Sequence, residues 1–131
     1  MKHLLTATLL FAAMPVSAQT AALFQDGKFA EAARAGRTEG TPAATILAAR
    51  SLMAVAAYET RDKARALATV RESVALLDGV LAKQPKNAEA LLQKGIAVGY
   101  VAKLNRLPGG AKEARKLMDA ARALDPKDAL A

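Results

Sequence analysis

The chain has no cysteine and no tryptophan, and its single histidine is His3. The missing cysteines exclude disulfides, thiolate nucleophiles and cysteine metal ligands. One histidine at the extreme N-terminus leaves no imidazole for a general base or a Ser-His pair elsewhere. The 12 Asp and Glu residues leave paired-carboxylate chemistry open, but no two of them form a recognisable site. With no phosphate loop or nucleophile elbow either, the sequence predicts a non-enzyme without cofactor or metal.

Acidic residues are also scarce, since 19 Lys and Arg outnumber them and give a net charge of +7. Two interpretations stay open: a solubilising surface charge, or an electrostatic binder of anionic envelope surfaces. The arrangement of the basic side chains distinguishes them, and the second requires that one face gather Lys28, Arg34, Arg37, Arg61, Arg65 and Arg71. Nothing resembles a base-reading element, so no nucleic-acid partner is expected.

A long hydrophobic run is present only at the N-terminus, over residues 4–14. Lys2 precedes it, and Val16-Ser17-Ala18 places small residues before a cleavage point, which is typical of a secretory signal peptide. We predict removal of residues 1–18 by cleavage between Ala18 and Gln19, and hence a periplasmic or secreted protein. The alternative is an uncleaved anchor, although the run is shorter than the roughly 20 residues of a membrane-spanning helix. No later segment is expected to span a membrane.

The rest of the chain is rich in alanine and lacks β-branched or aromatic runs, which predicts an all-α fold. Candidate N-caps are Thr41, Asp62 and Asn87, and Pro108-Gly109-Gly110 is predicted to form a loop. The expected helices cover residues 20–25, 28–37, 42–59, 63–83, 88–104 and 111–124. Helix 42–59 carries apolar residues on two sides, which predicts a position between two layers.

The helices repeat in pairs with a period of 41 residues. Ala32, Ser73 and Ala114 are spaced by 41, and the same interval separates three further pairs: Leu77 and Met118, Val80 and Ala121, and Pro85 and Pro126. The unit is therefore helix–turn–helix–Pro. The final PKDALA repeats the opening of PKNAEA at Pro85, so we expect the chain to be the N-terminal part of a longer array. The alternative is a short natural chain with a frayed tail.

The unit at 88–126 resembles the tetratricopeptide repeat. The family's large apolar, small and Pro positions read Leu91, Lys94-Gly95, Val98, Ala114, Met118, Ala121 and Pro126, and Phe29 matches the loop aromatic of an earlier copy. The period exceeds the family's 34 residues, Lys94 replaces a leucine, and three aromatic positions are aliphatic. Gly95 and Ala114 are the small residues at which the two helices of a hairpin are expected to approach closely.

The resemblance implies stacked antiparallel hairpins over residues 19–131, forming a right-handed solenoid of about two and a half repeats. It further implies a protein–protein interaction scaffold that binds a partner or peptide on its concave face. The family's groove positions fall on Leu92, Gln93, Ile96 and Tyr100, with Lys103 one turn beyond, and on Arg50 and Tyr58 in the preceding repeat.

Plain structural roles remain open for three of these residues. Arg50 either pairs with a carboxylate of a ligand or packs its stem while its head reaches solvent. Tyr58 and Tyr100 are either groove residues or half-buried packing residues at hairpin ends. Arrays of this kind usually end in a polar capping helix, and we expect none in this chain. The outer face of the last helix is therefore predicted to be exposed and open to self-association.

Overall fold

The computed structural model describes residues 16–125, which form helices joined by short turns. They are α2 (Val16–Gln25), α3 (Phe29–Glu39), α4 (Pro42–Ala54), the π-helical segment η1 (Val55–Glu59), α5 (Lys63–Lys83), α6 (Ala88–Asn105) and α7 (Pro108–Leu124). The fold of this part of the chain is all-α, as predicted. The signal peptide core, Pro126 and the repeated PKDALA ending lie outside the described residues. Helix α2 runs through the predicted cleavage point at Ala18 and Gln19.

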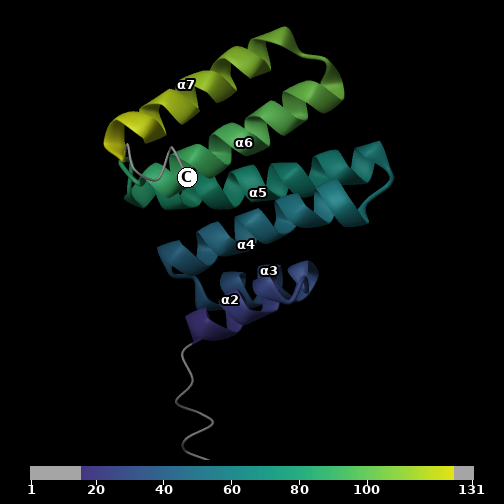
Figure 1. The fold of residues 1–131 in the computed structure, drawn as a ribbon, viewed down its shortest axis with the longest axis vertical. Helices are drawn as coiled ribbons and strands as arrows, with labels where there is room; N and C mark the ends of the chain where they lie inside the picture. The colour runs from purple at the N-terminus through teal and green to yellow at the C-terminus, as the bar shows by residue number, and fades with distance from the viewer. Residues whose placement is uncertain (1–15, 126–131) are drawn as a thin grey trace, which may run out of the picture.

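Successive helices run in opposite directions and stack one on another, from α2 and α3 at one end to α7 at the other (Figure 1). Each helix packs against the next in the chain, and α2 also contacts α4, as α4 contacts α6. Within residues 16–125, neither α3 with α5 nor α5 with α7 makes a contact of similar extent. The first helices of the hairpins therefore touch one another more than the second helices do.

Two apolar clusters hold the central helices together, one near each end of their length. The first joins the start of α4, the end of α5 and the start of α6 through Ile46, Leu77 and Ala90. The second joins η1, the first half of α5 and the second half of α6 through Ala56, Val70 and Ala97. Helix α4 therefore lies between α3 and α5, which confirms the position predicted from its two apolar sides.

The positions related by the 41-residue spacing are structurally alike. Ala32, Ser73 and Ala114 are all buried. The Ser73 hydroxyl donates a 2.9 Å hydrogen bond to the carbonyl oxygen of Ala49, so its polar atom is satisfied inside the α4–α5 contact. A small residue at this position lets the second helix of each pair approach its neighbour.

Glycines mark the closest helix contacts. A Cβ on Gly95 would lie 3.0 Å from the Met118 side chain and 3.1 Å from the Ala114 carbonyl oxygen, which confirms the predicted close approach of α6 and α7. A Cβ on Gly110 would lie 2.5 Å from that of Ala102 in the same hairpin. On α3, a Cβ on Gly36 would overlap the backbone carbonyl of Ala44 on α4. These seams need residues without a side chain.

Helix boundaries follow the sequence signals closely at three starts. The side chains of Thr41, Asp62 and Asn87 accept hydrogen bonds from backbone N–H groups two or three residues on, as N-caps do. The helix predicted over 63–83 has the bounds of α5. The helix predicted over 88–104 ends one residue before α6 does.

One prediction about local structure is wrong, and one helix with correctly predicted bounds changes its geometry partway. Residues 108–110 do not form a loop, because Pro108 occupies the first turn of α7 and the two glycines continue the helix. Proline is favoured there because its missing N–H has no helical partner in any case. The predicted helix 42–59 changes to π geometry at Val55, where the Thr60 hydroxyl donates to the Val55 carbonyl oxygen at 2.9 Å.

Asn87→Ala is expected to lower the free energy of unfolding by about 1 kcal/mol. The side-chain oxygen of Asn87 accepts from the N–H of Ala90 at 2.9 Å, and alanine leaves this donor without its cap. Urea unfolding followed by circular dichroism measures the change. Asn87→Asp keeps the acceptor and serves as the control; equal losses in both variants would mean that the cap is not the cause.

Candidate functional site

The predicted binding residues lie on the side of α4 and α6 that their hairpin partners leave uncovered. On α4, Ile46 and Ala49 face α5, while Ala44 and Ala48 face α3. Helical spacing places Arg50 on the third side of α4, and it places Ile96 on the third side of α6, away from Ala90 and Gly95. We call this surface the α4–α6 face; its members on the two helices are Leu47, Arg50, Leu92, Gln93, Ile96, Tyr100 and Lys103. Because α4 contacts α6 directly, these residues form neighbouring parts of one surface.

Arg50 is exposed and makes a specific contact within the chain. Its guanidinium carbon lies 5.0 Å from the ring centre of Phe24 on α2, a cation–π distance. Phe24 in turn meets Phe29 edge to face, with ring centres 5.4 Å apart. The resemblance assigned Phe29 as the loop aromatic of the first repeat. The residue spacing did not predict that Phe29 would pack against Phe24, the ring that contacts Arg50. The stack fixes the direction of the arginine while its charge remains accessible.

The two tyrosines have different environments. Tyr100 is half-buried and packs against the cluster that contains Ala56 and Val70, so the packing interpretation holds for it. Tyr58 lies in the π-helical segment and is 83% exposed, which contradicts the expectation of a half-buried packing residue. The change to π geometry at the end of α4 had no evident signal in the sequence. Tyr58 therefore belongs to the end of the α4–α5 hairpin, beside the α4–α6 face.

Helix α6 supplies most of the predicted surface. Ile96 is 41% exposed in the middle of the helix, which is a large apolar exposure for a central position. Gln93 donates a 3.0 Å hydrogen bond to Glu89, one turn before it. Lys94 is not part of this surface; its amine forms a 2.7 Å ion pair with Asp78 of α5. The face offers apolar contact area flanked by the cations Arg50 and Lys103.

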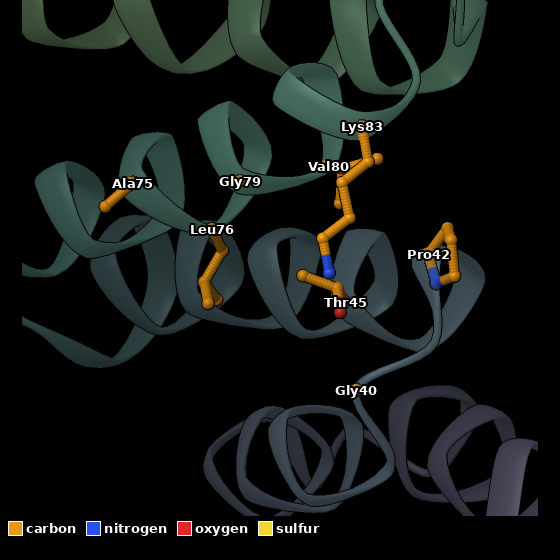
Figure 2. Close-up of a pocket in the computed structure, with 8 residues that line it drawn as sticks. All are labelled: Gly40, Pro42, Thr45, Ala75, Leu76, Gly79, Val80 and Lys83. Atoms are coloured by element: carbon orange, nitrogen blue, oxygen red, sulfur yellow. The ribbon is translucent and has the colours of Figure 1, made fainter.

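Two hollows lie away from the predicted residues. Figure 2 shows the first, of about 320 Å³, where the start of α4 meets the second half of α5 and the Lys83 side chain extends toward Thr45. The second, of about 280 Å³, has an apolar floor that includes Val74, Val98 and Val101, with Arg71 and Glu113 at its rim. A further shallow hollow at the α6–α7 hairpin end is lined in part by Lys103. Of the predicted residues, only Lys103 lines one of these three hollows.

The six basic residues chosen as a test of clustering do not gather on one face. Lys28, Arg61 and Arg65 lie at the starts of α3 and α5, whereas Arg34, Arg37 and Arg71 lie farther along these helices. Arg37 is paired with Glu72 at 2.8 Å, which joins α3 to α5. The six residues together therefore do not form one electrostatic surface.

The outer face of α7 differs from the equivalent face of α5. Helix α5 presents Val70, Val74, Leu77 and Leu81 toward α6, and the positions 41 residues later are Ala111, Arg115, Met118 and Arg122. Both arginines are exposed. This side of α7 is therefore more polar than the matching side of α5, and whether a capping helix covers it stays a prediction. Self-association through it remains a prediction, and any second copy would have to accommodate two guanidinium groups.

Metal-holding groups and membrane-spanning helices were sought over the described part of the chain. Within residues 16–125, no group of three or more His, Asp or Glu side chains is arranged to hold a metal ion. Over the same residues, no helix combines the length and apolar character that a bilayer span requires. No protein-family model, curated protein or solved structure matches the chain.

Proposed function

We propose that the protein is a non-catalytic interaction scaffold of tetratricopeptide-like architecture, in which the α4–α6 face is the concave binding surface for a protein or peptide partner. In this arrangement α2, α4 and α6 are the first helices of three hairpins, and their stacking forms a right-handed solenoid. The N-terminal segment adds the proposal that the scaffold acts in the periplasm or outside the cell.

The pattern of helix contacts is the observation that carries this proposal. The first helices touch each other along the stack, α2 with α4 and α4 with α6, while the second helices are farther apart. Hairpins that pack closely on one side and spread on the other generate a curved array whose first helices line the concave side. The glycine seams at Gly36 and Gly95 support the same architecture, because they let neighbouring helices approach closely.

The chemistry of the α4–α6 face favours a partner with apolar and acidic groups. Ile96 and Leu92 offer aliphatic contact area, and the accessible charge of Arg50 is held in a fixed direction by Phe24. An arginine oriented by an aromatic ring loses less side-chain freedom when it pairs with a carboxylate. We infer that an extended or helical segment with a carboxylate near an apolar side chain fits this surface.

The double variant Arg50→Glu/Ile96→Glu is expected to weaken binding of such peptides at least tenfold. Peptides selected from a random displayed library against the native protein provide the probe, and fluorescence anisotropy gives the dissociation constants. The substitutions remove the central cation and the exposed aliphatic contact, and they place carboxylates against an acidic ligand.

The matched control is Arg34→Glu/Ala82→Glu, which changes the net charge equally at exposed positions on α3 and α5. It should bind the selected peptides as the native protein does. Equal weakening by both variants would reduce the effect to net charge, and unchanged binding by the first variant would rule out the α4–α6 face.

A further inference from the structure

Two neighbouring hairpin turns lie at the same edge of the stack. The α4–α5 and α6–α7 connections appear together on the right of Figure 1, and the α3–α4 and α5–α6 connections lie on the left. The apolar cluster around Val70 joins η1, the first half of α5 and the second half of α6, which brings the two turns side by side. We call residues 58–65 and 103–112 together the turn edge.

Basic side chains dominate the turn edge. It carries six exposed cations and two carboxylates, Glu59 and Asp62, for a net charge of +4; the cations are Arg61, Lys63, Arg65, Lys103, Arg106 and Lys112. The opposite edge, residues 37–43 and 82–89, carries three cations and two carboxylates, for a net charge of +1. Among residues 16–125, the ion pairs are Arg37 with Glu72 and Lys94 with Asp78, so the cations of the turn edge are not paired with carboxylates.

Large apolar side chains are exposed at the same edge. Tyr58 is 83% exposed and Leu107 is 52% exposed, which makes them the most exposed large hydrophobic residues of the described chain. Each projects from the end of a different hairpin; Leu107 directly follows Arg106, and Tyr58 is separated from Arg61 by Glu59 and Thr60. The exposed tyrosine and leucine among these cations make the turn edge amphipathic. Charges that serve only solubility would not be expected to surround exposed apolar side chains.

We propose that the turn edge docks the protein onto an anionic phospholipid surface, with the cations at the headgroups and Tyr58 and Leu107 in the interfacial layer. Lys and Arg near an anionic leaflet are attracted to its surface potential, and tyrosine and leucine favour the boundary between headgroups and acyl chains. A membrane is flat and meets two protruding hairpin ends at once. An acidic protein would bury Tyr58 and Leu107 together only if it bridged both turns.

This inference is independent of peptide binding on the α4–α6 face, because Lys103 is the only residue that the two surfaces share. An edge-on contact leaves Arg50 and Ile96 away from the lipid. The protein could therefore hold a partner while attached to a membrane.

Vesicle co-sedimentation tests the proposal with the full chain. The probes are vesicles of pure phosphatidylcholine and vesicles with about one third phosphatidylglycerol, each at low and at high salt. We expect binding to the anionic vesicles only, and at least a tenfold weakening at high salt. Equal binding to both kinds of vesicle, or none to either, would overturn the proposal. Binding to soluble polyglutamate without binding to anionic vesicles would overturn it in favour of an acidic protein partner.

A pair of charge variants tests whether the turn edge is responsible. Arg61→Glu/Lys112→Glu is expected to weaken vesicle binding at least tenfold. Lys83→Glu/Lys86→Glu makes the same change in net charge at the opposite edge and should bind nearly as the native protein does. Both variants keep the N-terminal apolar run, so a difference between them reports on the edge. Equal loss in the two variants would refute a docking edge.

A single fluorophore tests insertion directly. The chain has no tryptophan, so Tyr58→Trp introduces one reporter at the exposed end of the α4–α5 hairpin. We expect a blue shift of its emission on addition of anionic vesicles, and none with phosphatidylcholine. An unchanged spectrum with bound anionic vesicles would show that Tyr58 does not enter the interfacial layer, contrary to the proposal.

Discussion

Gly36→Ala is expected to lower the free energy of unfolding by about 1–3 kcal/mol, although alanine is intrinsically the better helix former. A Cβ at this position would overlap the carbonyl oxygen of Ala44 and lie 2.9 Å from the Cβ of Ala48. Both atoms belong to the rigid part of α4, so no side-chain rotation relieves the overlap. The α3–α4 contact must separate, and apolar surface between the two helices loses its packing.

Gly79→Ala provides a matched comparison on α5. Gly79 is also inside a helix, but a Cβ there would meet no atom within 4 Å. With no overlap, the lower conformational entropy of alanine in the unfolded chain should raise the free energy of unfolding by about 0.5–1 kcal/mol. Urea unfolding of both variants gives the two values. Stabilisation by both substitutions would show that α3 and α4 are not in close contact at Gly36.

Leu77→Ala is expected to have the largest effect of a single apolar truncation, a loss of about 2–5 kcal/mol. Leu77 is 0% exposed and contacts both neighbours of α5, since its cluster includes Ile46 on α4 and Ala90 on α6. Removing it opens a cavity where three helices meet, and backbone shifts cannot fill it without separating one of them. This is a large fraction of the roughly 5–15 kcal/mol that stabilises a domain.

Leu124→Ala controls for the loss of leucine itself. Leu124 is 44% exposed near the end of α7, so we expect a loss below about 1 kcal/mol. Thermal unfolding measures both variants, and Leu77→Ala should lower the midpoint by several degrees more. Similar midpoints would contradict the central position assigned to Leu77.

Most of the helices could be predicted because their signals are local. A capping side chain satisfies backbone N–H groups two or three residues away, so Asp62 and Asn87 mark helix starts without reference to the rest of the fold. The 41-residue spacing also carried structural information, since it placed Ser73 and Ala114 at equivalent buried positions. Gly95 was correctly assigned to a close helix contact from its position in the tetratricopeptide pattern.

The failed predictions depended on what a residue meets in three dimensions. Gly109 and Gly110 are typical of a turn, yet they lie in α7, where the missing side chain of Gly110 makes room for Ala102. Gly36 lies near the end of the helix predicted over 28–37, and it makes a close packing contact with α4. The sequence does not distinguish a glycine in a turn from a glycine at a close helix contact. The atom that a side chain would collide with belongs to another helix, far away along the chain.

The candidate site was predictable as a helix face and less so as a set of side-chain environments. Spacing alone places Leu92, Ile96 and Lys103 on one side of α6. Tyr58 lies exposed in the π-helical segment η1, and Arg50 makes its contact with a ring from α2. Neither could be obtained from the 41-residue spacing, since both involve departures from repeat symmetry.

The contact between hairpins has a consequence for how the parts of this protein influence one another. Among residues 16–125, α2 and α3 contact α4, and α6 and α7 reach them mainly through the α4–α5 hairpin. Coupling in such an array passes between nearest neighbours, so cooperativity has to cross the central pair. A ligand that tightens α4 and α5 would slow hydrogen exchange in both outer hairpins. A disturbance confined to α2 would reach α7 only to the extent that the central hairpin transmits it.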